Sequence, residues 1–135
     1  MGETSTAVPG AAATHHRLTR LVALAFLLLV LHNIDEGFIH PESGGKLNVA
    51  GNVVVGVLVV VAHARLGRRW RIAMTAVLGV LATLQALGGH VLHLVDGDAQ
   101  PLDWSGLFYL AGGLLLIGVA VAVADFRARD GERDG

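Results

Sequence analysis

Four long apolar tracts, joined by short polar connections, constrain this chain more than any other feature of its sequence. A helix needs roughly 20 mostly apolar residues to cross a hydrocarbon core about 30 Å thick. Each tract meets that length, and inside lipid only helices and closed barrels satisfy their own backbone hydrogen bonds. We therefore predict an all-α fold, a four-helix antiparallel transmembrane bundle with short loops. The expected spans cover residues 18–39, 47–66, 72–95 and 104–124.

The segments that flank these spans are predicted to be tails. Residues 1–16 are small and polar and lack helical periodicity, so we expect a disordered amino-terminal tail. This segment makes a poor signal peptide, because Arg17 and Arg20 come late and the next apolar tract has full spanning length. Residues 127–135 form a charged carboxyl-terminal tail, which leaves residues 17–126 as the four-span unit.

Composition excludes several classes of protein. Only 16% of the residues are charged, against about a quarter in a soluble domain. The absence of cysteine excludes disulfides, thiolate nucleophiles and Cys-ligated zinc or iron–sulfur sites. A net charge of −1 gives no support to nucleic-acid binding, which needs a basic face.

The expected partners are membrane lipids and an apolar small-molecule substrate, and a homo-oligomer is an open alternative.

The distribution of positive charge predicts the orientation of the spans. Nine of the ten Lys and Arg residues precede the first span, lie between the second and third, or follow the fourth. The opposite side holds only Lys46. We therefore predict that both termini are cytoplasmic, and that residues 41–46 and 96–103 face outward from a cell membrane.

Ionisable residues interrupt the spans near their predicted outer ends. Such a residue costs roughly 2.5–3.5 kcal/mol inside a span on insertion scales, so it normally faces the bundle interior and marks function. His32, Glu36 and His40 recur every four residues and share one helix face. Asp35 lies beside that face. The other spans add polar residues at the same level: Asn48, Asn52, Gln85, His90, His93, Asp103, Ser105 and Tyr109.

Imidazoles beside carboxylates suit two chemistries, and spacing alone does not choose between them. They can act as general acid and base. In that case we expect Glu36 to be the general acid or base, with Asp35 and His32 as its partners. His93 would be the opposing base. Residues expected to contact substrate or support these groups are Asn48, Asn52, His40, Gln85 and Tyr109. The alternative is a divalent metal such as zinc, iron or manganese, with the ligands His32, Glu36, His90 and His93.

Simpler interpretations apply to some of these residues. Asp35 and Glu36 can mark the boundary between membrane and water. Asn48 and Asn52 can be interhelical hydrogen-bonding groups, and the many helix glycines can allow close helix packing. His63 lies near the opposite end of the second span, and we predict that its side chain faces the membrane interface.

The segment LHNIDEGFIHP at the end of the first span resembles the signature of the HXXEE family of small multi-pass bacterial membrane proteins. The match is His32-x-x-Asp35-Glu36, with Asp35 in place of the first Glu, followed by Phe38 and Pro41. Asparagines early in the second span and histidines late in the third are also similar to that family's layout. The resemblance implies an important His/carboxylate site and a bacterial membrane location, and it names no reaction.

The function that these observations favour is a small integral membrane enzyme acting on a lipid-like or isoprenoid substrate. Its His/carboxylate site in the outer half of the bundle would perform acid–base or metal-assisted chemistry. We expect His32, Glu36 and His93 to point into one cavity, with Asn52 on its wall. The alternatives are a divalent-metal or proton binding or transport protein, and a structural subunit of a membrane complex.

Overall fold

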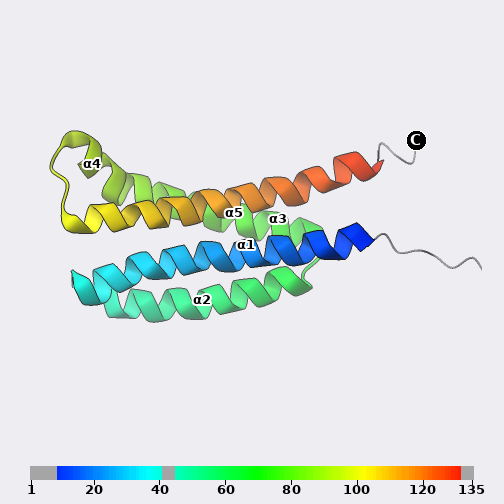
Figure 1. Cartoon of the computed structure of the whole chain (residues 1–135), viewed down its shortest axis with the longest axis horizontal. Helices are drawn as coiled ribbons and strands as arrows, with labels where there is room; N and C mark the ends of the chain where they lie inside the picture. Colours follow the sequence, from blue (N-terminus) through cyan, green and yellow to red (C-terminus); the bar gives the residue numbers. More distant parts are fainter. Residues whose placement is uncertain (1–8, 41–44, 132–135) are drawn as a thin grey trace, which may run out of the picture.

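The computed structural model describes residues 9–40 and 45–131, and this part of the chain contains helices and no strands (Figure 1). The element order is α1 (Pro9–Ile34), the π-helical turn η1 (Asp35–Ile39), α2 (Gly45–Arg65), α3 (Arg68–Ala86), the π-helical turn η2 (Leu87–Val91), α4 (Leu92–Asp96) and α5 (Pro101–Gly131).

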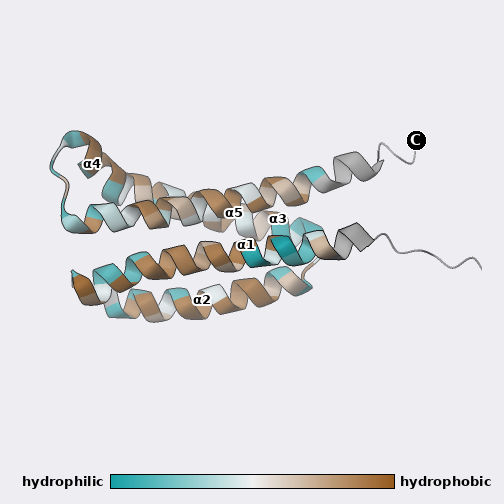
Figure 2. Cartoon of the chain, in the orientation of Figure 1, coloured by the Kyte–Doolittle hydropathy of each residue, from teal (hydrophilic) through white to brown (hydrophobic). Residues whose placement is uncertain are grey.

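Within the described residues, four helical stretches are long and apolar enough to cross a membrane, which confirms the predicted fold class. They are Ala13–Ile39, Lys46–Arg65, Arg68–Asp96 and Pro101–Asp125. Figure 2 shows hydrophobic residues along the middle of the bundle, and its hydrophilic residues gather toward the two ends. This pattern is the one that a helix needs across a hydrocarbon layer. The direction in which the helices cross the membrane stays a prediction.

Several helix ends differ from the predicted boundaries. α1 begins at Pro9, inside the segment expected to be a tail, because proline is favoured in the first helical turn and the following alanines favour helix. Residues 1–8 lie outside the described part of the chain. The link between α2 and α3 is shorter than expected, since Arg68 already belongs to α3. Its guanidinium donates hydrogen bonds to the carbonyls of Val123 and Ala124 on α5.

The helices pack in the order α2, α1, α5, α3. The major interfaces join α2 to α1, α1 to α5 and α5 to α3. α2 and α3 are consecutive in the chain and yet have no major interface with each other, so the bundle is more open than the predicted one. Its core consists of side chains from α1, α2, α3 and α5, including Phe26, Leu29, Val59, Ala82 and Leu116.

The two ends of the bundle differ in charge. The start of α1, the end of α5 and the α2–α3 link lie together at one end (Figure 1). We call this the arginine end, after Arg65, Arg68, Arg69 and Arg71. η1, the start of α2, α4 and the start of α5 lie at the other end. We call it the acidic end, after Asp35, Glu36, Asp96, Asp98 and Asp103.

Glycines allow α1 and α3 to lie tightly against α5. A Cβ atom on Gly112 would come within 2.9 Å of the Ala25 carbonyl oxygen, and one on Gly79 within 2.8 Å of the Gly113 carbonyl oxygen. Small residues at such positions let helix backbones approach closely. The same role does not extend to all helix glycines, because a Cβ atom would meet open space at Gly51, Gly88, Gly89 and Gly118.

Candidate functional site at the acidic end

The two spans that bring histidines to the acidic end both change helix type there. α1 continues as η1, and α3 continues as η2 before α4 begins. In η1 the backbone N–H of His40 donates to the carbonyl oxygen of Asp35, five residues earlier, at 2.7 Å. π-helical turns are rare and are frequently found at functional sites. The two turns carry Asp35, Glu36 and His90, which are all predicted site residues.

The π-turn changes which side chains share a face. The predicted face of His32, Glu36 and His40 assumed 3.6 residues per turn. In the structure His40 pairs with Asp35, with 2.8 Å between Nδ1 and Oδ1. Glu36 instead contacts α2, where Asn48 Nδ2 lies 3.4 Å from both carboxylate oxygens. The hydrogen-bond partner of His40 is therefore Asp35, the residue five positions earlier.

His32 lies at the centre of the cluster and is only 3% exposed. Its Nδ1 atom is 2.9 Å from the hydroxyl oxygen of Ser105. The ring meets His90 at 4.6 Å and Tyr109 at 5.3 Å between centroids, each at an interplanar angle of 74°. Residues of α5 and η2 thus hold this imidazole from different directions.

The hydrogen bonds of Ser105 assign the tautomer of His32. A serine hydroxyl has a single proton to donate, and here the hydroxyl donates it to the Leu102 carbonyl oxygen at 2.9 Å. The hydroxyl also lies within hydrogen-bonding range of the Asp35 carboxylate. With its proton given to either of these acceptors, Ser105 accepts from His32, and the assigned tautomer has the proton on Nδ1 of His32. The lone pair of the neutral ring is therefore on Nε2, which makes that nitrogen the basic one.

Asp103 is the buried carboxylate of the cluster, with 4% exposure. It accepts a hydrogen bond from the Gln100 backbone N–H at 2.7 Å and one from His90 Nδ1 at 3.2 Å. His93 Nδ1 lies 3.8 Å away, within ion-pair range and beyond hydrogen-bond length. The first turn of α5 favours an anion here, because its backbone N–H groups and helix dipole point toward it.

Gly106 makes room for His90. A Cβ atom at this position would overlap the His90 imidazole, so only glycine lets the ring lie directly against α5. The fourth span therefore supplies the centre of the site through Asp103, Ser105 and Gly106. The sequence predicts polar residues at Asp103 and Ser105 but gives neither a role in the site, and it assigns Asp103 to the outward-facing connection. The missed signal is the pattern Gln100-Pro101-x-Asp103, in which an acid in the first turn caps its own helix.

A second set of contacts connects the cluster to α2. The Tyr109 hydroxyl is in polar contact with the Asn52 side chain, and Glu36 lies within electrostatic reach of the same tyrosine. Asn52 Nδ2 donates to the Asn48 carbonyl oxygen at 3.2 Å. A series of contacts thus runs from Glu36 on η1 through α2 to the residues around His32.

The remaining predicted residues lie at the edges of this cluster. His93 is exposed, and its neighbour in the cluster is Asp103, whereas Glu36 contacts Asn48 of α2. Gln85 is exposed on α3, and no hydrogen bond joins it to the cluster among the residues that the structure describes.

The described residues do not assemble the predicted metal site. Within 9–40 and 45–131, no three His, Asp or Glu side chains are placed so that they could hold a metal ion. The expected ligands are divided among different partners: Glu36 contacts Asn48, His90 donates to Asp103, and His32 donates to Ser105. Hydrogen bonds from Nδ1 to oxygen leave Nε2 as the basic nitrogen of these two imidazoles.

Comparison of the chain with protein-family models, with curated proteins and with solved structures gives no match. The similarity to the HXXEE signature therefore rests on the residues quoted above. Any function has to be argued from the site itself.

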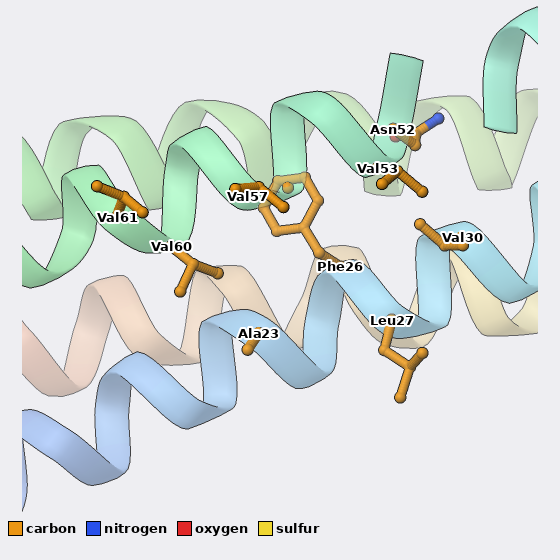
Figure 3. A pocket seen from close by; sticks show the side chains of 10 residues that line it. Ala23, Phe26, Leu27, Val30, Asn52, Val53, Val57, Val60 and Val61 are labelled. Atoms are coloured by element: carbon orange, nitrogen blue, oxygen red, sulfur yellow. The ribbon is translucent and has the colours of Figure 1, made fainter. Parts of the chain in front are cut away.

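An apolar groove with a volume of about 430 Å³ runs between α1 and α2 (Figure 3). It is lined by Ala23, Phe26, Leu27 and Val30 of α1 and by Asn52, Val53, Gly56, Val57, Val60 and Val61 of α2. Asn52 is its polar residue and lies at the end of the groove toward the acidic end.

A second histidine cluster lies at the arginine end. His63 is fully buried, so its side chain packs inside the bundle. Its Nδ1 atom is 3.1 Å from the Thr19 hydroxyl, and its ring lies nearly parallel to that of His15, with 6.0 Å between centroids. The Nε2 atoms of both rings are buried and have no hydrogen-bond partner among the described residues.

Proposed function

We propose that the cluster at the acidic end carries out acid–base chemistry on a lipid-like substrate within a membrane. The observation that supports this proposal most strongly is the buried series of Asp103, His90, His32 and Ser105. Both imidazoles in it use Nδ1 to donate to an oxygen, and both therefore have Nε2 available for proton transfer.

The proposed roles follow from these contacts. Asp103 orients His90 and stabilises the positive ring that forms when Nε2 takes a proton, as a buried carboxylate does in a Ser-His-Asp triad. Ser105 orients His32 in the same tautomer. One imidazole accepts a proton from the substrate while the other, already protonated, returns a proton to it. Glu36 is the proposed additional acid or base on the side toward α2.

Proton transfer across the membrane is the second candidate, and the buried His15–His63 pair at the arginine end favours it. An apolar layer separates the two clusters, because the inward-facing residues of α1 between them are Val22, Ala25, Phe26 and Leu29. That layer makes the enzyme the stronger of the two proposals.

Deuterium uptake tests the proposed reaction without knowledge of the substrate. The full chain is reconstituted into vesicles of a bacterial lipid extract in D₂O, and all lipids are followed by mass spectrometry. The expected result is a lipid that gains deuterium with the parent protein, about 100-fold or more slowly with His90→Gln, and at the parent rate with the matched control His63→Gln. If no lipid gains deuterium in a protein-dependent manner, the enzyme proposal is wrong. Acidification of the vesicle lumen that requires His63 would favour the transport function.

We further propose that the chain is an HXXEE-like protein of a bacterial cell membrane and that both of its termini are cytoplasmic. The sequence motif supports the first part, and the asymmetry of positive charge supports the second. The chain has no cysteine, so single cysteines report position cleanly. Asp98→Cys and Arg69→Cys place exposed thiols at the acidic and arginine ends. An impermeant maleimide added to intact cells should label the first variant and leave the second unlabelled. Labelling of both from outside, or of the arginine end alone, would contradict the orientation.

A further inference from the structure

We propose that the groove between α1 and α2 binds the single hydrocarbon tail of the substrate, and that the head of this substrate is a non-anionic group that donates a hydrogen bond, such as an alcohol. This inference rests on the proposed function, since it assigns a substrate class to the same site. It is carried by the shape of the groove and by the charges at its polar end.

The shape of the groove fits one extended tail. Its volume of about 430 Å³ lies within the roughly 300–1,000 Å³ typical of small-molecule sites. Its α2 wall runs from Asn52 to Val61, which is about 14 Å along a helix at 1.5 Å per residue. Gly56 lies directly over the Phe26 ring, because a Cβ atom there would come within 3.0 Å of that ring. Figure 3 shows this ring pointing toward α2 from α1.

The groove is open to the surrounding apolar phase along its length. α2 has its major interface with α1 alone, together with contacts to η1, so no third helix covers the space between them. Side chains on the outer rim are exposed, among them Leu27, Val53 and Val57. A substrate tail can therefore enter sideways from the membrane.

The polar end of the groove leads to the candidate site. Asn52 donates to the Asn48 carbonyl oxygen and contacts the Tyr109 hydroxyl. Tyr109 in turn packs against the His32 ring. A head group held at Asn52 therefore lies next to Tyr109, which contacts the residues to which we assign proton transfer.

The charges at that end determine which heads fit. The carboxylate of Glu36 lies near this end, in contact with Asn48, whereas the nearby ammonium of Lys46 is 5.7 Å over the Phe38 ring. A phosphate or carboxylate head would meet the like charge of Glu36, which is unfavourable. A hydroxyl can donate to Glu36 and accept from an asparagine amide. Ordinary phospholipids are for this reason poor occupants.

Photolabelling tests the proposal on the full chain in uncharged lipid vesicles. The probe is a long-chain alcohol with a diazirine in its tail, and the labelled residues are found by mass spectrometry. We expect labels within residues 23–30 and 52–61. An unlabelled alcohol of the same length should compete, and a fatty acid of that length should compete at least fivefold less well. Equal competition by the fatty acid would overturn the assigned head group.

A pair of adjacent substitutions on α2 separates the groove from general lipid contact. Val57 lines the groove and is 59% exposed, whereas Leu58 is 63% exposed and does not line it. Val57→Phe should reduce labelling at least fivefold, while Leu58→Phe leaves it unchanged. Equal effects of the two substitutions, or labels spread around α2, would overturn the tail site.

The outcome for the groove and the outcome for the reaction are read separately. Labelling does not require turnover, so it should persist in His90→Gln. Groove labelling with no protein-dependent deuterium uptake would refute the proposed reaction and support the tail site. Deuterium uptake that requires His90 but is insensitive to Val57→Phe, with no groove labelling, would support the reaction and refute the tail site.

Discussion

The bundle holds two buried histidine clusters, and they differ in their neighbours. At the acidic end, His90 donates to a buried carboxylate and His32 to a hydroxyl. At the arginine end, His63 contacts a threonine hydroxyl and another imidazole, and the guanidinium of Arg71 is within electrostatic reach. A carboxylate stabilises a protonated ring, whereas a guanidinium opposes it. The neighbours of a buried histidine, more than its burial, therefore indicate which cluster can exchange protons.

The largest expected effect follows from removing the charge of Asp103. Asp103→Asn keeps the size of the side chain and an oxygen for the Gln100 N–H. It removes the charge that stabilises a protonated His90 ring. It also allows the tautomer of His90 in which Nδ1 carries no proton. We expect deuterium uptake to fall by about 10²–10⁴, with helical content unchanged by circular dichroism.

His63→Gln is the matched control for this substitution at the arginine end. If His63→Gln stops uptake while Asp103→Asn retains more than half of it, the functional cluster is at the arginine end, and the comparison between the two ends has to be reversed.

A smaller effect is expected from filling the space against His90. Gly106→Ala adds one methyl group that overlaps the ring, so the imidazole has to move away from α5. Displacement of a reacting group by about 1 Å can cost on the order of 100-fold in rate. We expect uptake to fall about 10–100-fold, measured beside Gly118→Ala, whose methyl group meets open space. Equal rates for the two variants would show that the position of His90 does not matter.

At the arginine end we expect a change in stability without a change in rate. His63→Ala leaves a cavity at a fully buried position and removes the partner of Thr19. The free energy of unfolding should fall by about 1–3 kcal/mol, with deuterium uptake per folded molecule at the parent level. Thermal unfolding in detergent, together with uptake at matched expression, separates the two quantities. A rate that falls with unchanged stability would give this cluster a functional role.

The sequence predicts the four helices and the position of the candidate site along the bundle, because both depend on local properties. Apolar length determines the spans, and His32, Asn52 and Tyr109 are polar within otherwise apolar tracts. The sequence does not predict how the side chains pair. In the turn η1, residues that share a helix face are five positions apart in the chain, whereas in an α-helix they are four apart. Whether such a turn forms depends on how the end of α1 packs against its neighbours. The role of Gly106 depends on a ring that approaches from another helix, and nothing local to residue 106 specifies it.

The smallest expected effect tests that altered pairing. His40 is exposed and joins Asp35 across η1. An exposed ion pair contributes only about 0–1 kcal/mol. His40→Gln preserves a hydrogen-bond donor and removes the ionisable ring, so we expect stability to change by less than about 1 kcal/mol and uptake by less than about threefold, well short of a typical loss on removing a general acid or base. The measurement is uptake beside Asp103→Asn in the same membranes. If His40→Gln reduced uptake as strongly as Asp103→Asn, the face of His32, Glu36 and His40 would be functional after all. Proton transfer would then take place at η1, on the exposed side of the acidic end.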